Sequence, residues 1–128
     1  MLEQIKTFDS NTVAFEIIDS FTETDEKLAQ KLFKEKLDSG FQTVNILVKI
    51  DQYKISQTEA KAFFEDIIFV IRKFKNIGNL AIVGHSKILK AFVPIDNFFF
   101  ERIKKGKKEL YFDVSQLEEA IEFVTNPV

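Results

Sequence analysis

The chain has 128 residues, of which 45% are apolar and 30% are charged, and its formal net charge is −2. This balance is typical of one soluble globular domain spanning residues 1–128, and the charge gives no basic surface for nucleic acid. The absence of cysteine excludes disulfides, thiolate metal sites and cysteine nucleophiles. With no secretion signal and no apolar run long enough for an integral membrane segment, we expect a cytoplasmic protein.

The first half of the chain predicts a hairpin followed by a helix. Leu2 to Phe8 and Thr12 to Ile18 are expected to be antiparallel strands joined by a polar turn. The second of them alternates apolar and polar residues, which predicts a strand with one buried face. A helix is predicted over residues 21–39, with Thr22 opening a capping box and Gly40 as its left-handed C-cap.

The middle of the chain predicts a βαβ unit. Asn45 to Ile50 and Leu80 to Val83 are short apolar runs, as expected of strands that are buried on both faces. A long helix lies between them, roughly from Gln57 to Lys75, and Gly78 is expected to end the crossover. Its apolar surface is wider than one stripe, so we expect the sheet on one side and a second helix or a partner chain on the other.

The last third predicts two further helical regions around one strand. Ser86 is expected to cap a short helix that reaches Phe92, and a second helical piece is expected over residues 95–104. Leu110 to Phe112 reads as a strand, and Ser115 is expected to cap the closing helix. The order β-β-α-β-α-β-α-β-α indicates an α/β fold, with an opening β-hairpin, a mainly parallel sheet of about five strands and helices packed on that sheet.

Sites in parallel sheets form beyond the carboxyl ends of the strands. The polar residues expected along this rim are Asp19, Ser20, Thr22, Asp51, Tyr53, Ser56, Gly84, His85, Ser86, Asp113 and Ser115. Several of them lie at helix N-termini, where an anion is stabilised.

The segment from Gly84 to Ser86 has part of the nucleophile elbow of a hydrolase, which is Gly-x-Ser-x-Gly after a strand. The second glycine is missing, and the only histidine, His85, is adjacent to the serine. A triad needs a histidine from elsewhere in the chain, so we disfavour a hydrolase. No metal-ligand spacing and no phosphate-binding glycine loop is present. We therefore expect no enzyme, no catalytic residue, no metal and no cofactor.

Several segments together resemble a known family. The matching features are Val48-Lys49-Ile50-Asp51 with Tyr53, the helix carrying Ala60, Phe64 and Glu65-Asp66, the strand Leu80 to Gly84 with Ser86-Lys87, and Leu110-Tyr111-Phe112 followed by Leu117 to Ile121. They resemble the SpoIIAA-like proteins of the STAS (sulfate transporter and anti-sigma-factor antagonist) group, over nearly the whole chain. The resemblance implies a right-handed βα superhelix, similar in topology to the CRAL-TRIO lipid-exchange domains.

In the anti-sigma-factor antagonists of this group, a serine that follows a central strand at a helix N-terminus accepts phosphate. Ser56 is the nearest position in this chain and is the phospho-acceptor candidate that the resemblance implies. The loop from Asp51 to Ile55 is longer than the antagonists' turn. Ser56 as an ordinary N-cap is therefore the alternative.

The aromatic segment from Phe92 to Ile103 leaves three interpretations open: a lid over an apolar cavity, a dimer patch, or ordinary packing. The lid or ligand candidates are Phe92, Pro94, Phe98, Phe99 and Phe100, and the interface candidates are Phe69, Phe98 and Phe100. Our leading hypothesis is a non-enzymatic STAS-like regulatory module of bacterial type that binds a partner protein or itself as a homodimer. The alternative is a carrier or sensor for a small apolar, lipid-like ligand held under residues 92–103.

Overall fold

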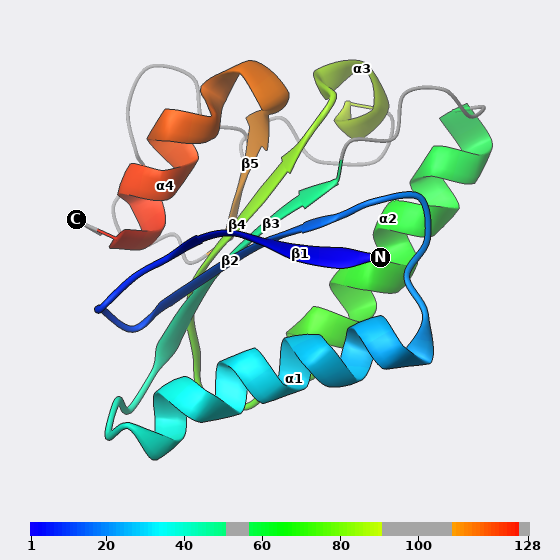
Figure 1. Ribbon diagram of the computed structural model, residues 1–128. Helices are drawn as coiled ribbons and strands as arrows, with labels where there is room; N and C mark the ends of the chain where they lie inside the picture. Colours follow the sequence, from blue (N-terminus) through cyan, green and yellow to red (C-terminus); the bar gives the residue numbers. More distant parts are fainter. Residues whose placement is uncertain (51–56, 91–108, 126–128) are drawn as a thin grey trace.

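The computed structural model describes residues 1–50, 57–90 and 109–125, and Figure 1 shows how these parts are arranged. In chain order the elements are β1 (Leu2–Thr7), β2 (Thr12–Ile17), α1 (Glu23–Asp38), β3 (Val44–Ile50), α2 (Gln57–Arg72), β4 (Ile77–Gly84), α3 (Ser86–Leu89), β5 (Glu109–Asp113), the 3-10 turn η2 (Val114–Gln116) and α4 (Leu117–Thr125). The predicted order of strands and helices is confirmed for these ranges. The helical piece expected over residues 95–104 lies outside them.

The described strands form one sheet in the order β1-β2-β3-β4-β5. β1 pairs with β2 in antiparallel fashion, which confirms the hairpin, and each later pair is parallel. In the register of the sheet, Ile46 of β3 lies opposite Val13 on one side and Leu80 on the other. The βαβ unit is therefore confirmed, and the sheet is mainly parallel with five strands, as expected.

Helices cover both faces of the sheet: α1 and α2 lie on one face and α4 lies on the other (Figure 1). Alternate strand residues point to opposite faces, so Ile46, Val48 and Ile50 of β3 pack towards α1 and α2, and Leu47 packs towards α4. When successive strands are added in one direction across a sheet and their connections have the same handedness, the connecting helices lie on the same face. The shared face of α1 and α2 is consistent with the right-handed βα superhelix that was expected.

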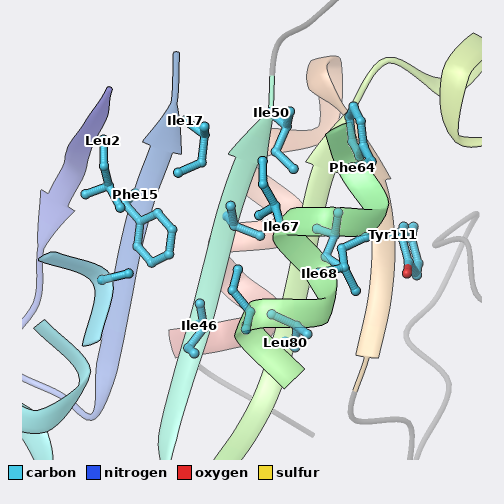
Figure 2. Packing of buried hydrophobic residues seen from close by; sticks show 14 of the residues in the cluster. Leu2, Phe15, Ile17, Ile46, Ile50, Phe64, Ile67, Ile68, Leu80 and Tyr111 are labelled. Atoms are coloured by element: carbon cyan, nitrogen blue, oxygen red, sulfur yellow. The ribbon is translucent and has the colours of Figure 1, made fainter. Parts of the chain in front are cut away.

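The larger core lies between the sheet and the two helices α1 and α2. Figure 2 shows Phe64, Ile67 and Ile68 of α2 pointing towards the strands. The exposed fraction of each of these side chains is 3% or less. Burial of apolar area at about 25 cal/mol per Å² is the main favourable term in folding, so this face of α2 holds the sheet and helix layers together.

The prediction of a half-buried β2 was wrong. Val13, Phe15 and Ile17 face the core under α1 and α2, and Ala14 on the opposite side is buried in the second core, beneath α4. The sequence alternates, but Ala14 and Thr12, which were assigned to the solvent-facing side, are both buried. The Thr12 hydroxyl donates to the carbonyl oxygen of Val124 at 2.9 Å, which satisfies its hydrogen bond in the interior.

The two helix ends that were predicted around α1 are confirmed. Thr22 and Asp25 form a reciprocal capping box, and Gly40 has a φ of +103°. The prediction for Gly78 was wrong, because Asn76, with a φ of +68°, supplies the left-handed residue before β4. Gly78 lies inside β4, where an added Cβ would lie 2.2 Å from the side-chain oxygen of Asn45.

Candidate functional site

The carboxyl ends of the parallel strands meet along one edge of the sheet, which we call the rim. The register brings Ile17 opposite Ile50, Ile50 opposite Gly84, and Gly84 opposite Asp113. The rim groups that follow β2, β4 and β5 are described, whereas Asp51, Tyr53 and Ser56 lie outside the described residues. The sheet therefore brings three of the four predicted rim groups to one edge.

Asp113 accepts several hydrogen bonds at the rim. One carboxylate oxygen accepts the backbone N–H of Ser86 at 3.0 Å, and the other accepts the N–H and the hydroxyl of Ser115 at 3.0 and 2.6 Å. Burial pushes the pKa of Asp113 up, but the hydrogen bonds from Ser115 and Ser86 outweigh it and hold the pKa well below its usual range. The Asp113 carboxylate thus joins the start of α3 to the start of η2.

This arrangement corrects two predicted caps. Asp113, in a capping box with Gln116, precedes the closing helical region, and Ser115 donates to Asp113. The N-cap residue of α3 is His85, one position earlier than predicted, and its side chain makes no capping hydrogen bond. An anion at the start of α3 is thus already supplied by the protein itself.

Gly84 has a packing role in the segment that resembles part of a nucleophile elbow. A Cβ at this position would lie 2.7 Å from two ring carbons of Phe64, which is closer than real Cβ contacts come. The glycine therefore allows α2 to pack tightly over the end of β4. This contact explains Gly84 without any catalytic turn.

The rim residues that follow β2 also form a helix cap, at the start of α1. The Asp25 carboxylate accepts the Thr22 backbone N–H at 2.8 Å and the Thr22 hydroxyl at 3.0 Å. The hydrogen bond from the Thr22 backbone is the main cause that lowers the pKa of Asp25. Asp19 has a φ of +63°, a left-handed conformation that Asp tolerates better than most residues. Thr22 and Asp25 are thus held by hydrogen bonds within the chain.

The outward face of α2 presents a different kind of surface. Phe69 is 62% exposed on the side of the helix opposite the buried Phe64, Ile67 and Ile71. The Lys73 ammonium lies 4.1 Å from the centre of the Phe69 ring, within cation–π range. Aromatic side chains of this size are usually buried. Phe69 was an interface candidate, and the structure leaves it open to solvent.

A cluster at the far edge of the sheet was missed by sequence reasoning. The Arg72 guanidinium donates to both carboxylate oxygens of Glu109, at 3.1 and 2.5 Å, and the Tyr111 hydroxyl donates to Glu109 at 3.1 Å. Burial, followed by the nearby Glu109 charge, raises the pKa of Tyr111, so the phenol stays protonated and donates. The cluster ties the end of α2 to β5. Arg72 is 37 positions from Glu109 and 39 from Tyr111, and no local sequence pattern predicts a contact over that separation.

A hollow of about 240 Å³ lies between the hairpin and α1. Its lining mixes apolar, hydroxyl and charged side chains: Gln4, Thr7, Phe8, Thr12, Val13, Leu32, Glu35, Lys36 and Ser39. The Lys36 ammonium beside it donates to the carbonyl oxygens of Phe8 and Ser10 at 2.5 and 2.7 Å. These bonds attach α1 to the hairpin turn, so Lys36 has a structural role there.

The remaining candidates belong to other parts of the chain. Ser56, Phe92, Pro94, Phe98, Phe99 and Phe100 lie outside the described residues. In the ranges 1–50, 57–90 and 109–125, no three His, Cys, Asp or Glu side chains gather in a way that could hold a metal ion. Over the same ranges, no helix has the length and apolar character required to span a bilayer.

Comparison with known proteins identifies a family for this chain. A family model described as SpoIIAA-like matches residues 12–125, from β2 to the end of α4. No curated protein and no solved structure matches the chain. The family that its segments resembled is thus the family whose model covers most of the chain.

Proposed function

We propose that this chain is a non-enzymatic regulatory module of bacterial STAS type, because it belongs to the SpoIIAA-like family. In this proposal residues 1–128 form one cytoplasmic domain that acts by binding a protein through the outward face of α2. The family is generally composed of non-enzymatic domains of the anti-sigma-antagonist kind, which often mediate protein interactions. The regulatory class rests on the family, and the binding surface rests on the features of α2.

The observation that carries this choice of surface is the exposure of Phe69. Only two other large apolar residues of the described ranges are more than a third exposed, Met1 at 51% and Leu28 at 38%. Exposed aromatic side chains are enriched where proteins bind one another. The described part of the rim offers less exposed apolar surface, and its Asp25 and Asp113 carboxylates accept hydrogen bonds from their own chain.

The phospho-switch at Ser56 and the apolar-ligand carrier remain predictions. Both depend on residues outside the described ranges. The hollow between the hairpin and α1 is lined by a different set of residues from those expected to form the lid. Protein binding through α2 is therefore the function that we advance.

A photo-cross-linking amino acid at position 69 tests this proposal. The matched control carries the same amino acid at position 31, where Lys31 is exposed on α1. In cells that produce the chain naturally, we expect the position-69 variant to give a discrete adduct, with its own chain or with another protein, and the position-31 variant to give none. Equal yields at the two positions, or no adduct at either, would contradict the proposal.

A further inference from the structure

We infer that the protein bound at the outward face of α2 is a second copy of the chain, with the two α2 helices antiparallel and the twofold axis passing near Phe69. This inference rests on the proposed function, because it names the partner of the same surface. It is argued from the order of the charges along the helix.

Three outward residues of α2 lie on one stripe. Asp66, Phe69 and Lys73 are spaced three and four positions apart, which places them on the same side of a helix. All three are exposed. Along the stripe, a negative residue comes first, an aromatic residue lies in the middle, and a positive residue comes last.

This order is complementary to itself only when the second helix is reversed. At a rise of 1.5 Å per residue, Asp66 lies about 4.5 Å before Phe69 along the axis, and Lys73 lies about 6 Å after it. A twofold axis at Phe69 therefore places Asp66 of one copy nearly level with Lys73 of the other. Measured along the helix axis, the two residues are offset by about 1.5 Å. A parallel pairing would instead put like charges opposite each other, which is unfavourable.

The neighbouring charges of α2 have partners within their own chain. Lys61 lies 3.8 Å from Glu65, and Arg72 is bonded to Glu109. Lys73 lies over the Phe69 ring and, among the described residues, forms no ion pair with a carboxylate. In the same part of the chain, Asp66 forms no ion pair and no hydrogen bond. Asp66 and Lys73 are thus the charges of this stripe that a second copy can use.

A single helix stripe buries less area than a permanent dimer requires. We therefore expect a reversible dimer, with Phe69 stacked at the centre and two symmetry-related Asp66–Lys73 pairs at its sides. Because the twofold axis repeats each contact, one charge reversal alters two pairs at once.

Sedimentation velocity over a range of concentrations, using the full chain and charge-swap variants, tests the inference. We expect Asp66→Lys and Lys73→Asp each to raise the dimer dissociation constant about tenfold, since exposed pairs are individually small and are here counted twice. The double variant Asp66→Lys/Lys73→Asp should recover wild-type association. An equimolar mixture of the two single variants should form heterodimers. Lys31→Asp on α1 should change nothing.

Several results would overturn the inference. One is a wild-type chain that stays monomeric up to about 1 mM, the weak end of measurable affinity. Another is a double variant that associates no better than the single variants while keeping a wild-type circular dichroism spectrum. A monomeric chain whose position-69 cross-link captures another protein would remove the dimer and leave the proposed function intact. A monomeric chain with no cross-link would remove both.

Discussion

Several side chains on the rim stabilise the fold, although their residue types resemble those of a catalytic site. Asp113 accepts hydrogen bonds from Ser86 and Ser115, and Gly84 leaves room for the Phe64 ring. A serine, a histidine and a carboxylate near one strand edge would ordinarily raise the question of catalysis. Here the carboxylate is bonded to the backbone of one serine and to the backbone and hydroxyl of the other, so it acts as a helix cap.

The Asp113→Asn variant should lose stability in a pH-dependent manner. The pKa of Asp113 is lower in the folded chain than in the unfolded chain, so its stabilising effect is complete above the unfolded value of about 3.9 and is lost as the pH falls through the folded value. At pH 7 we expect Asp113→Asn to cost about 1 kcal/mol, as for a lost cap. Urea unfolding at several pH values should show that the difference in unfolding free energy between wild type and variant becomes smaller below about pH 4.

Asp38→Asn is the matched control, because Asp38 is an exposed carboxylate at the end of α1. Its effect should stay within about 0.5 kcal/mol at pH 7. A gap for Asp113→Asn that stays constant from pH 7 to pH 2 would refute the assignment of Asp113 as a charged cap.

The Gly84→Ala variant should be destabilised through its contact with Phe64. The added methyl group would lie 2.7 Å from the ring, and overpacking of this kind costs about 1–3 kcal/mol. In a Phe64→Leu background the same substitution should cost less, because the ring carbons it meets are gone. Unfolding free energies of the four variants in this cycle measure the coupling, and an identical cost in both backgrounds would rule out the packing explanation.

At the scale of single elements, α4 is attached to the sheet by polar groups from three strands. Besides Thr12, the Asn45 amide donates to the carbonyl oxygen of Val124 at 2.8 Å, and the Asn79 amide donates to that of Phe123 at 3.3 Å. The Asn45 side-chain oxygen also accepts the Asn79 backbone N–H at 2.7 Å. The last carbonyls of a helix have no partner within it, and these side chains supply one.

The Asn45→Ala variant should loosen the end of α4. It removes one bond from the Val124 carbonyl and leaves the Asn79 N–H without its acceptor, which costs about 1–3 kcal/mol for buried groups. Hydrogen exchange should become faster over residues 117–125, and global stability should fall in urea unfolding. Asn11→Ala, which removes an exposed bond to the Thr43 carbonyl, is the control. If the two variants exchanged alike, the anchoring role of Asn45 would be wrong.

The elements and their order could be predicted from the sequence because each depends on local pattern. The apolar runs of β3 and β4, the capping box at Thr22 and the turn at Gly40 are signals read within a few residues. The polar anchors of α4 and the Arg72–Glu109–Tyr111 cluster join residues 37 to 112 positions apart. Which strand a distant side chain reaches depends on the sheet register, so no local pattern reports it.

The candidate surface could be predicted only in part, because its apolar residues follow a local pattern whereas their exposure does not. The helical spacing of α2 indicated more apolar surface than one stripe, and Phe69 was named from it. Whether Phe69 is exposed depends on tertiary packing, which the residue spacing along one helix does not report. In the structure, the Phe33 ring of α1 packs edge-on against Phe74 at 5.2 Å, near the end of α2, and Phe69 stays open. That coverage is a property of tertiary packing.

At the scale of the whole molecule, helices cover both faces of the sheet (Figure 1). The Phe69 side chain of α2 is nevertheless left largely in solvent. Membership of the SpoIIAA-like family fits a regulatory module. The account depends on the outward face of α2 being a protein-binding surface.

The yield of cross-linked adduct from position 69, compared with position 31 in the same cells, tests that claim most directly. We expect one discrete adduct at position 69, either a dimer of the chain or its complex with another protein, and none at position 31. If position 69 gives no adduct, or if the two positions give the same products in the same yield, the face of α2 is ordinary surface and the account is wrong.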